Sequence, residues 1–588
     1  MDVTPHPEHP RPDFERRPWC SLNGVWELAT DARDVGLAQE WWRRSSFPER
    51  IMVPYPVGSE LGGVPEIDGP RGVYWYLRRF DLPEEMRDRC LRLHFGAADY
   101  HARVWLNDVL LGDHEGGYTP FVFDVTDRVR VRDNRLVVRV ADSRSNRQVR
   151  GKQTWQARPG GVFYPGISGL WQTVWLEAVG PSHLSDLRLH ADLKGACFHV
   201  RASVERPEAA AFLDVYRVLP DGERRMAASL RVASGRVSGA VPIADPCPWS
   251  PAAPHLYEFD LVLRTPDGAE LDRVHTYGGL RDVEVAGGQF LLNGRPLYQR
   301  LVLVQGYFPG GVYTPASDEG WRRDVELARA MGFDGVRMHQ KIEAPRFLHW
   351  CDRLGLLVWA EFPSAYWPGR ESRRQIRRML PEVIGRDAGH PSIVVWVLFN
   401  ESWGIQDINW SAQTRIEVMQ IVRHAHHLDP SRPIIDNSGF DHLETNIVDI
   451  HQYLESLEQA EAVYDDLLAG RLWRHALLPG LRYMTQPHKA FKPPLAPHVR
   501  YQGQPLFVSE YGGFGHYRSR VPGDLLEQYQ AATLAIARRP RIRGFCYTQL
   551  YDVYQERDGL LTFDRQPKVP LEALRAFNEA LVASVHGR

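Results

Sequence analysis

The last part of the chain constrains the fold most, because strand-like and helix-like segments alternate from about residue 290 onward. Apolar residues recur at helical spacing in 318–332, 345–355 and 414–428. We expect strands over residues 297–306, 335–339, 356–363, 392–401, 433–438, 447–453, 505–511 and 543–551. Such an alternation of eight strands with helices predicts a (β/α)8 TIM barrel. Residues 454–504 fit the pattern poorly and are expected to form an insertion at the mouth of the barrel.

The residues before the barrel predict two β-domains. Up to about residue 180, short runs of aromatic and β-branched residues such as "GVYWYLRRF" are separated by turn residues. A second block of about seven short strands follows, with turns at "PDGE" and "PDGA". We therefore predict a multidomain protein with a jelly-roll β-sandwich over 1–180, an immunoglobulin-like β-sandwich over 181–285 and the barrel over 286–588.

Two of the predicted barrel strands run directly into a glutamate. The apolar run "VVWVLF" ends in Asn400 and Glu401, and "PLFVS" ends in Glu510 and Tyr511. By order these are strands 4 and 7, whose C-terminal ends face each other at the end of the barrel that carries the chemistry of barrel enzymes. Two carboxylates that flank one bond suit glycoside hydrolysis, which requires a separation of about 5–5.5 Å for retention of configuration. Their pKa values must differ, so that one is protonated while the other is ionised.

Composition argues against several classes of function. The 71 Lys and Arg against 73 Asp and Glu give a formal charge of −2, which does not favour nucleic-acid binding. The six cysteines are scattered without a CxxC pair, so neither a zinc ribbon nor a disulfide framework is expected. The N-terminus has no apolar signal segment, and no apolar run is long enough to span a bilayer. We expect a cytoplasmic protein with no membrane partner.

Several motifs, taken in order, resemble glycoside hydrolase family 2, which includes β-galactosidases, β-glucuronidases and β-mannosidases. "SLNGVWEL" and "PGISGLWQTVWLE" look like its N-terminal sugar-binding domain, and "GFDGVRMHQ", "FNESWG" and "FVSEYGG" look like its barrel landmarks. The resemblance covers about residues 20–580. It implies a retaining exo-glycosidase that works through a covalent glycosyl-enzyme and acts on a carbohydrate. We expect no cofactor, and because some β-galactosidases of the family bind magnesium or sodium near the site, a supporting metal ion stays open. The resemblance also implies a homo-oligomer, a dimer or a tetramer.

The resemblance also implies roles for individual residues. Glu401 matches the general acid/base, and Glu510 matches the nucleophile. Asn400 matches the asparagine that binds the sugar 2-hydroxyl, and Arg337 the arginine that keeps the nucleophile ionised. Tyr453 matches a tyrosine beside the nucleophile. Side chains at strand ends and nearby aromatic rings are expected to make further contacts with the substrate. These residues are His339, Glu361, Trp403, His451, Asp436 and Tyr511, with Asn437, Tyr366 and Trp367 as additional candidates.

Structural roles stay open for some of these residues. Arg337 could form a plain barrel salt bridge, and Glu401 could cap its strand. His339 and His451 could be hydrogen-bonded strand-end histidines. Glu361 could be structural or could bind sugar hydroxyls.

The sequence departs from the family where the sugar is recognised. β-Glucuronidases of the family carry an Asn-x-Lys motif after the last strand, whereas this chain has "LLTFDRQPK", with Arg565 and Lys568 as the only basic side chains. "HQKIEAPRF" also differs from the corresponding β-galactosidase segment. We expect a β-galactoside-like or an arabino- or galactofuranoside substrate, with a β-glucuronide or a β-mannoside as the alternative.

Two other classes of function are alternatives to a glycosidase. A non-catalytic carbohydrate-binding protein would have lost one of the two glutamates, and both are present. A metal-dependent hydrolase would need a cluster of histidines and carboxylates. "HAHH" at 424–427 lies in a predicted helix without a matched third ligand, so we expect no metal there.

Overall fold

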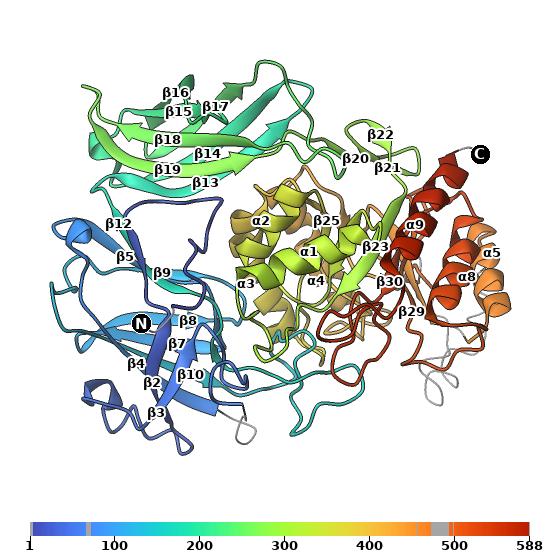
Figure 1. Ribbon diagram of the computed structural model, residues 1–588, viewed down its shortest axis with the longest axis horizontal. Coiled ribbons are helices and arrows are strands. Elements are labelled where there is room, and N and C mark those ends of the chain that lie inside the picture. Colours follow the sequence, from blue (N-terminus) through green and yellow to red (C-terminus); the bar gives the residue numbers. More distant parts are fainter. Residues whose placement is uncertain (1–3, 66–71, 454, 472–492, 498, 587–588) are drawn as a thin grey trace.

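The computed structural model describes residues 4–65, 72–453, 455–471, 493–497 and 499–586. Figure 1 shows three parts in chain order: a β-sandwich, a second β-domain beside it, and an α/β barrel that contacts both. The predicted multidomain architecture is therefore confirmed. Within the described residues, no helix combines the length and the apolar character that crossing a membrane requires.

The first domain is built from two antiparallel sheets, ordered β1-β12-β5-β9 and β3-β2-β4-β10-β7-β8, with a short β6–β11 pair. Alternate residues of β5, namely Leu91, Leu93 and Phe95, point into a core that also contains Trp26 and Tyr76. The strands are β1 Trp19–Ser21, β2 Gly24–Thr30, β3 Glu49–Val53, β4 Gly72–Phe80, β5 Cys90–Phe95, β6 Ala98–Asp99, β7 His101–Leu106, β8 Val109–Glu115, β9 Phe121–Asp124, β10 Asn134–Asp142, β11 Gly169–Leu170 and β12 Val174–Val179. Short 3-10 helices cover η1 Trp41–Arg43 and η2 Glu84–Met86.

The second domain is a seven-stranded sheet ordered β13-β14-β17-β16-β15-β18-β19, with η3 Pro207–Ala209 between β14 and β15. Its core contains Phe198, Val200, Leu261 and Val274. The strands are β13 His183–Asp192, β14 Cys197–Glu205, β15 Phe212–Val218, β16 Arg224–Ala233, β17 Arg236–Pro242, β18 Tyr257–Arg264 and β19 Glu270–Gly278.

A small three-stranded sheet leads from the second domain to the barrel. It consists of β20 Val283–Ala286, β21 Gln289–Leu292 and β22 Arg295–Pro296. Just before it, the buried guanidinium of Arg281 donates hydrogen bonds to the carbonyls of Pro391 (3.0 Å) and Ile393 (2.9 Å) at the start of a barrel strand. This arginine ties the second domain to the base of the barrel.

All eight predicted barrel strands are present, in the order β27-β26-β25-β24-β23-β30-β29-β28. Their interior is nearly continuously apolar, as expected for parallel strands buried on both faces. The strands are β23 Gln299–Val304, β24 Gly335–Met338, β25 Leu357–Glu361, β26 Ile393–Val397, β27 Ile434–Ile435, β28 Val448–Gln452, β29 Leu506–Gly512 and β30 Ile542–Thr548. The described helices are α1 Asp318–Ala330, α2 Pro345–Leu354, α3 Arg370–Asp387, α4 Ala412–Leu428, α5 Leu457–Leu468, α8 Leu525–Ala537 and α9 Leu571–His586.

The barrel departs from a regular alternation at one place. Residues 436–447, between β27 and β28, form no helix. We call these residues the seam loop. The residues expected to form an insertion, 454–504, begin with α5, which packs against α8 as an ordinary barrel helix. Residues 472–492 of the expected insertion lie outside the described part.

Candidate active site

The C-terminal ends of the barrel strands bring the two predicted glutamates together. Glu401 follows β26, and Glu510 lies in β29. One carboxylate oxygen of each glutamate and one ring nitrogen of His451 all lie within 4.8 Å of one another. This spacing belongs to the short class of carboxylate pairs and not to the class separated by about 6.5–9.5 Å.

Glu510 is held by two donors. Nη1 of Arg337 donates a 2.8 Å hydrogen bond to its Oε1, and the hydroxyl of Tyr453 donates a 2.6 Å hydrogen bond to its Oε2. Burial and the negative charge of Glu510 keep the pKa of Tyr453 well above its ordinary value, so this phenol remains a donor at neutral pH. Charge-assisted hydrogen bonds of this kind favour the ionised carboxylate.

Arg337 is fully buried and depends on a second carboxylate, Glu361 at the end of β25. Nε of Arg337 donates to Glu361 at 2.8 Å, and Nδ1 of His339 lies 3.1 Å from the same carboxyl group. Burial raises the pKa of Glu361 to about 7, against the opposing effect of Arg337. Burial and the charge of Lys152 lower the pKa of His339 well below its usual value, so its imidazole is neutral. Glu361 and His339 thus position Arg337.

Asn400 is oriented by the same arginine. Nη2 of Arg337 donates a 2.7 Å hydrogen bond to Oδ1 of Asn400, which assigns the amide orientation. The Nδ2 group of Asn400 has no hydrogen-bond partner among the described side chains and is available to donate to a sugar hydroxyl. Glu510 and Asn400 are therefore fixed by one buried guanidinium.

Glu401 sits on strained backbone. Glu401 and Ser402 both have positive φ, 50° and 59°, which costs a non-glycine residue about 1–2 kcal/mol. The backbone N–H of Glu401 donates to the carbonyl of Ser438 at 2.9 Å, and that of Ser402 donates to Oδ1 of Asn437 at 2.8 Å. The side chain of Glu401 is 31% exposed against 8% for Glu510, so Glu401 is the glutamate that can exchange protons with water.

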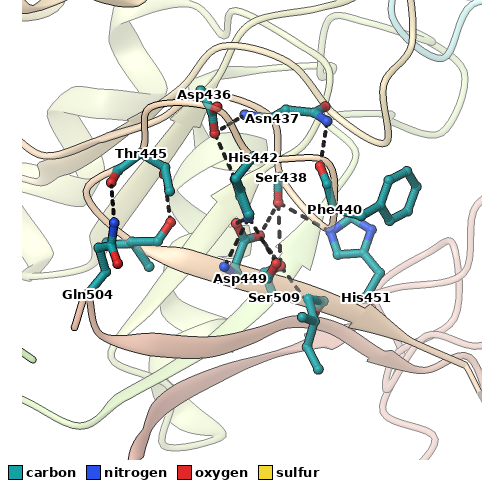
Figure 2. Close-up of polar contacts among 12 residues, drawn as sticks. Asp436, Asn437, Ser438, Phe440, His442, Thr445, Asp449, His451, Gln504 and Ser509 are labelled. Carbon is teal, nitrogen blue, oxygen red and sulfur yellow. Dashed lines mark hydrogen bonds and ion pairs between the residues drawn. The ribbon is translucent and has the colours of Figure 1, made fainter. Parts of the chain in front are cut away.

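A series of polar contacts through β28 and the seam loop links Glu401 to the barrel interior. Figure 2 shows the part of this series formed by His451, Ser438, Ser509 and Asp449. Nδ1 of His451 lies 2.8 Å from Oε1 of Glu401, and its Nε2 lies 3.2 Å from the hydroxyl of Ser438. Ser438 and Ser509 both donate to the buried carboxylate of Asp449. A continuous chain of polar contacts therefore runs from Glu401 through His451 and Ser438 to Asp449.

His442 of the seam loop is the last residue in this series of polar contacts. Its Nδ1 lies 2.7 Å from Oδ1 of Asp436, and its Nε2 lies 3.2 Å from Oδ1 of Asp449. Against the effect of burial, Asp436 and Asp449 raise the pKa of His442 to about 10, so a buried imidazolium sits between two carboxylates. Figure 2 shows His442 between β27 and β28, where it joins the two strands by side chains.

Some sequence predictions need correction. Asp436 is fully buried, and its carboxylate is occupied by His442 and the backbone N–H groups of Leu443 and Glu444, so it does not face a substrate. Tyr511 is 1% exposed, and its hydroxyl lies 2.6 Å from that of Thr533 on α8. Successive side chains of a strand point to opposite faces, so Glu510 points inward while Tyr511 points toward the helices.

The remaining candidates also differ in their surroundings: one amide is buried, two rings stack on other rings, and one ring is exposed. Asn437 is buried, and its amide supports the backbone and hydroxyl of Ser402. Trp403 is 7% exposed and stacks on Phe163, and Tyr366 stacks on Trp155. Trp367, in contrast, is half exposed on the surface.

The sequence analysis missed a contribution from the first domain. Its loop 143–168, which we call the sandwich loop, reaches the barrel mouth, where the backbone N–H of Gly151 donates to the carbonyl of Ser364 at 3.0 Å. Lys152 is 8% exposed, and its Nζ lies 5.0 Å from the ring centroid of Trp403. Among the described residues, no hydrogen bond or ion pair to this Nζ is present. A free cation therefore lies beside the candidate site.

The end of β30 supplies carboxyl groups rather than cations. Nε2 of Gln549 donates to Asp558 at 2.8 Å and to Glu556 at 3.3 Å. Burial, reinforced by Glu556, raises the pKa of Asp558 well above its usual value. Burial and the charges of Glu556, Glu401 and Glu510 raise the pKa of Tyr517, so this ring is influenced by both sets of carboxyl groups.

The two basic residues after this strand are already paired. The guanidinium of Arg565 binds both oxygens of Asp324, at 2.9 and 3.0 Å. Nζ of Lys568 binds Asp552 at 2.7 Å. Neither is available to bind a substrate carboxylate.

Metal binding at this site would compete with catalysis. Glu401, His451 and Glu510 have the spacing of a metal-ligand group. Arg337 and Tyr453 already occupy both oxygens of Glu510, however, and the guanidinium repels a cation. The histidines at 424–427 lie in α4 and belong to no ligand group found in the described part of the chain.

Comparison with known proteins agrees with the geometry along most of the chain. The sequence matches "Glycosyl hydrolases family 2, sugar binding domain" over residues 19–164, "Glycosyl hydrolases family 2" over 182–281, and "Glycosyl hydrolases family 2, TIM barrel domain" over 283–514. It is 24% identical to a β-glucuronidase of Paenibacillus borealis, over 94% of this chain and 96% of that protein. It is 28% identical to a β-galactosidase of Thermoanaerobacter pseudethanolicus, over 62% of this chain but only 48% of that protein.

Solved structures with the same fold include enzymes that act on acidic sugars. A β-glucuronidase from Ruminococcus gnavus aligns with a TM-score of 0.77 at 20% identity, over 98% of this chain and all of that one. A β-galacturonidase from Eisenbergiella tayi bound to galacturonate aligns with a TM-score of 0.75 at 20% identity, over 97% of this chain and 98% of that one.

Proposed function

The chain belongs to glycoside hydrolase family 2 and is a glycosidase, and from this membership we propose that it removes a terminal sugar with retention of configuration. The observation that carries the proposal is the pair of strand-end glutamates, with oxygens within 4.8 Å of each other and different surroundings. Glu510 is buried and bound to Arg337, which suits a nucleophile, whereas Glu401 is partly exposed, which suits an acid/base. The position of the sandwich loop beside the mouth of the barrel supports the removal of single terminal sugars.

The reaction proceeds in two displacements. Glu510 attacks the anomeric carbon while Glu401 donates its proton to the departing glycosidic oxygen, which leaves a covalent glycosyl-enzyme. Glu401, now ionised, takes a proton from water, the water oxygen attacks the anomeric carbon, and Glu510 leaves as a carboxylate. Asn400 donates to the sugar 2-hydroxyl, an interaction that strengthens in the transition state.

We propose a neutral galacto- or arabino-configured sugar as the substrate, in pyranose or furanose form. The supporting observation is the set of side chains at the end of β30, where the carboxyl groups of Glu556 and Asp558 can bind sugar hydroxyls and the nearby Arg565 and Lys568 are not free to bind a carboxylate. Arg565 and Lys568, the cations expected to replace the Asn-x-Lys motif, are bound to other carboxylates.

A β-hexuronide is the second candidate, because of Lys152. Its ammonium group lies beside Trp403 without an anionic partner among the described residues, and a substrate carboxylate could supply one. The relatives named β-glucuronidase, three of which match 94% of the chain, support this candidate.

A panel of aryl glycosides tests the proposal. Wild type, Glu401→Gln and Glu510→Gln are assayed on para-nitrophenyl and 2,4-dinitrophenyl glycosides of both sugar classes, with the exposed Glu326→Gln as the control. Glu510→Gln is expected to lose activity on every aglycone. Glu401→Gln is expected to lose about 10²–10⁴-fold on the poorer leaving group and less on dinitrophenol, which needs no acid. If activity survives both substitutions, Glu401 and Glu510 are not the catalytic residues.

Lys152→Met separates the two sugar classes. If a uronide is the substrate, this substitution raises KM or lowers kcat on the uronide and leaves neutral glycosides unchanged. If a neutral sugar is the substrate, wild type acts on the neutral glycoside and fails on the uronide.

A further inference from the structure

The tip of the β13–β14 hairpin in the second domain carries four side chains that can bind a metal ion. They come from the stretch "HADLKGACFH" and are His190, Asp192, Cys197 and His199. Asp192 is paired across the hairpin with Cys197, and His190 with His199. Residues two apart on a strand share a face, so all four side chains lie on the same face of the hairpin. Phe198 lies between two of them in sequence and points the other way, into the domain core.

The donor atoms of three of these residues already have a metal-like spacing. Nε2 of His199 lies 3.4 Å from Oδ2 of Asp192 and 3.8 Å from Sγ of Cys197, and all three donor atoms lie within 4.8 Å of one another. With ordinary zinc bond lengths, a tetrahedral site places a nitrogen about 3.4 Å from an oxygen and about 3.6 Å from a sulfur. A zinc ion therefore fits between these atoms with small side-chain movements.

The hairpin turn holds the carboxylate in place. The backbone N–H of Gly195 donates a 2.7 Å hydrogen bond to Oδ1 of Asp192, which leaves Oδ2 directed at His199. A Cβ atom at position 195 would lie 2.4 Å from Oδ2 of Asp192, so only glycine leaves the carboxylate in this position. The hydrogen bond from Gly195 thus orients the carboxylate of Asp192, as hydrogen bonds from residues outside the coordination shell orient ligands in known metal sites.

We propose that Asp192, Cys197 and His199 bind one divalent transition-metal ion of the zinc class. Thiolate, imidazole and carboxylate are all zinc ligands, and the thiolate selects against magnesium and calcium. On binding, the thiol of Cys197 loses its proton to solvent as the sulfur–metal bond forms, with no change of oxidation state. His190, whose ring centroid lies 6.3 Å from that of His199, or a water molecule completes the tetrahedron.

The surroundings indicate a structural role for this ion. The site opens into a hollow of about 180 Å³ whose lining also includes Lys194 and Asp282. Asp282 follows Arg281, the residue that ties the second domain to the barrel, and lies 3.3 Å from Nζ of Lys194. A metal at this place would fix the hairpin tip beside the joint between the two domains. It lies in a different domain from Glu401 and Glu510, so the ion is not part of the glycosidase reaction.

Cobalt substitution tests the site independently of activity. The full-length protein is freed of metal with a chelator and titrated with Co²⁺, then with Zn²⁺. Wild type is expected to bind one equivalent with a near-ultraviolet thiolate-to-cobalt band and the visible bands of a tetrahedral ion. Zn²⁺ should displace the cobalt and raise Tm. The candidate active-site group, Glu401, His451 and Glu510, contains no thiol, so a thiolate band cannot come from that group.

Three variants decide between a metal site and a simple ion pair. Cys197→Ser should lose the thiolate band and the Zn²⁺-dependent rise in Tm, and His199→Ala should lose the rise and weaken binding at least about tenfold. Cys247→Ser, at an exposed cysteine of the same domain, should keep both. The proposal is overturned if wild type gives no thiolate band, or if the band survives Cys197→Ser. A Tm of the His199→Ala variant that still rises with Zn²⁺ as in wild type also overturns it.

Discussion

At the scale of single residues, the candidate site depends on one buried guanidinium. Arg337 donates to Glu510, Glu361 and Asn400, so it fixes the positions of both strand-end side chains, Glu510 and Asn400. Glu361 offsets part of the cost of burying this charge. Glu401 lies outside this cluster and contacts His451 instead. Nε2 of the same His451 lies 3.5 Å from Oε1 of Glu510, so the two glutamates share this imidazole, but only Glu510 is bound to the guanidinium. A retaining mechanism requires such a difference between the two carboxyl groups.

Tyr453→Phe tests the second donor to Glu510. The substitution removes the 2.6 Å hydrogen bond to Oε2 and little volume, so the fold should be unchanged. We expect kcat/KM to fall about 10- to 100-fold, the effect of losing one hydrogen bond to a charged group. Steady-state kinetics on the best aryl glycoside, with Tm as the measure of folding, gives the answer. An unchanged kcat/KM would mean that Tyr453 does not support the nucleophile.

Residue type and strand order were enough to find the two glutamates, because the end of a barrel strand is a defined place. Residue type and strand order were not enough to predict which neighbouring side chains face the site. Tyr511 and Asp436 were expected to bind substrate, but Tyr511 points outward from its strand and Asp436 is bound to His442. The direction of a side chain at a strand end depends on the local pleat and on a partner that is distant in the fold, and one sequence supplies neither.

At the scale of elements, the seam loop replaces a barrel helix. β27 has only two residues, and no backbone pairing with β28 is present among the described residues. The imidazolium of His442 joins the two strands instead, between Asp436 and Asp449. Asp449 is linked through Ser438 to His451 and hence to Glu401. The stability of the seam loop and the placement of the Glu401 side chain are therefore coupled.

His442→Gln should destabilise the protein in a pH-dependent way. The folded pKa of about 10 lies above the ordinary value of 6.5, so the contribution of His442 is full below about pH 6.5 and is lost as the pH rises toward 10. The substitution leaves two buried carboxylates without their cation, which costs about 3–5 kcal/mol. The difference in Tm from wild type should be large at pH 6 and small near pH 10.

The exposed His427→Gln on α4 is the matched control for that experiment and should show no such pH dependence. A difference in Tm between wild type and His442→Gln that stays constant from pH 6 to pH 10 would contradict a buried imidazolium.

At the scale of the whole molecule, the candidate site is shared between domains. The sandwich loop places Lys152 and Phe163 beside Trp403, although these two residues lie about 250 and 240 residues earlier in the chain. The order of the three domains and every barrel strand followed from local patterns in the sequence. The contribution of Lys152 did not, because nothing in its neighbourhood in the sequence indicates a contact with a different domain.

Gly151→Ala should displace the sandwich loop. Gly151 has a φ of +60°, and an added Cβ would lie 2.0 Å from the carbonyl oxygen of Gln340 on the barrel. We expect about a 10- to 100-fold loss in kcat/KM, since small displacements of site residues are costly. Gly160→Ala in the same loop is the control, because its added Cβ meets nothing within 4 Å. Equal activities of the two variants would mean that the loop does not contribute to the site.

The central claim is that Glu510 is the nucleophile and Glu401 the acid/base of a retaining glycosidase. The most direct test is azide rescue of Glu401→Ala and Glu510→Ala on a dinitrophenyl glycoside, with the anomeric configuration of the glycosyl azide read by NMR. Glu401→Ala should give the azide with retained configuration, since azide attacks the glycosyl-enzyme. Glu510→Ala should give the inverted azide by direct attack. The opposite assignment of configurations, or inversion in the wild-type reaction, would contradict the account.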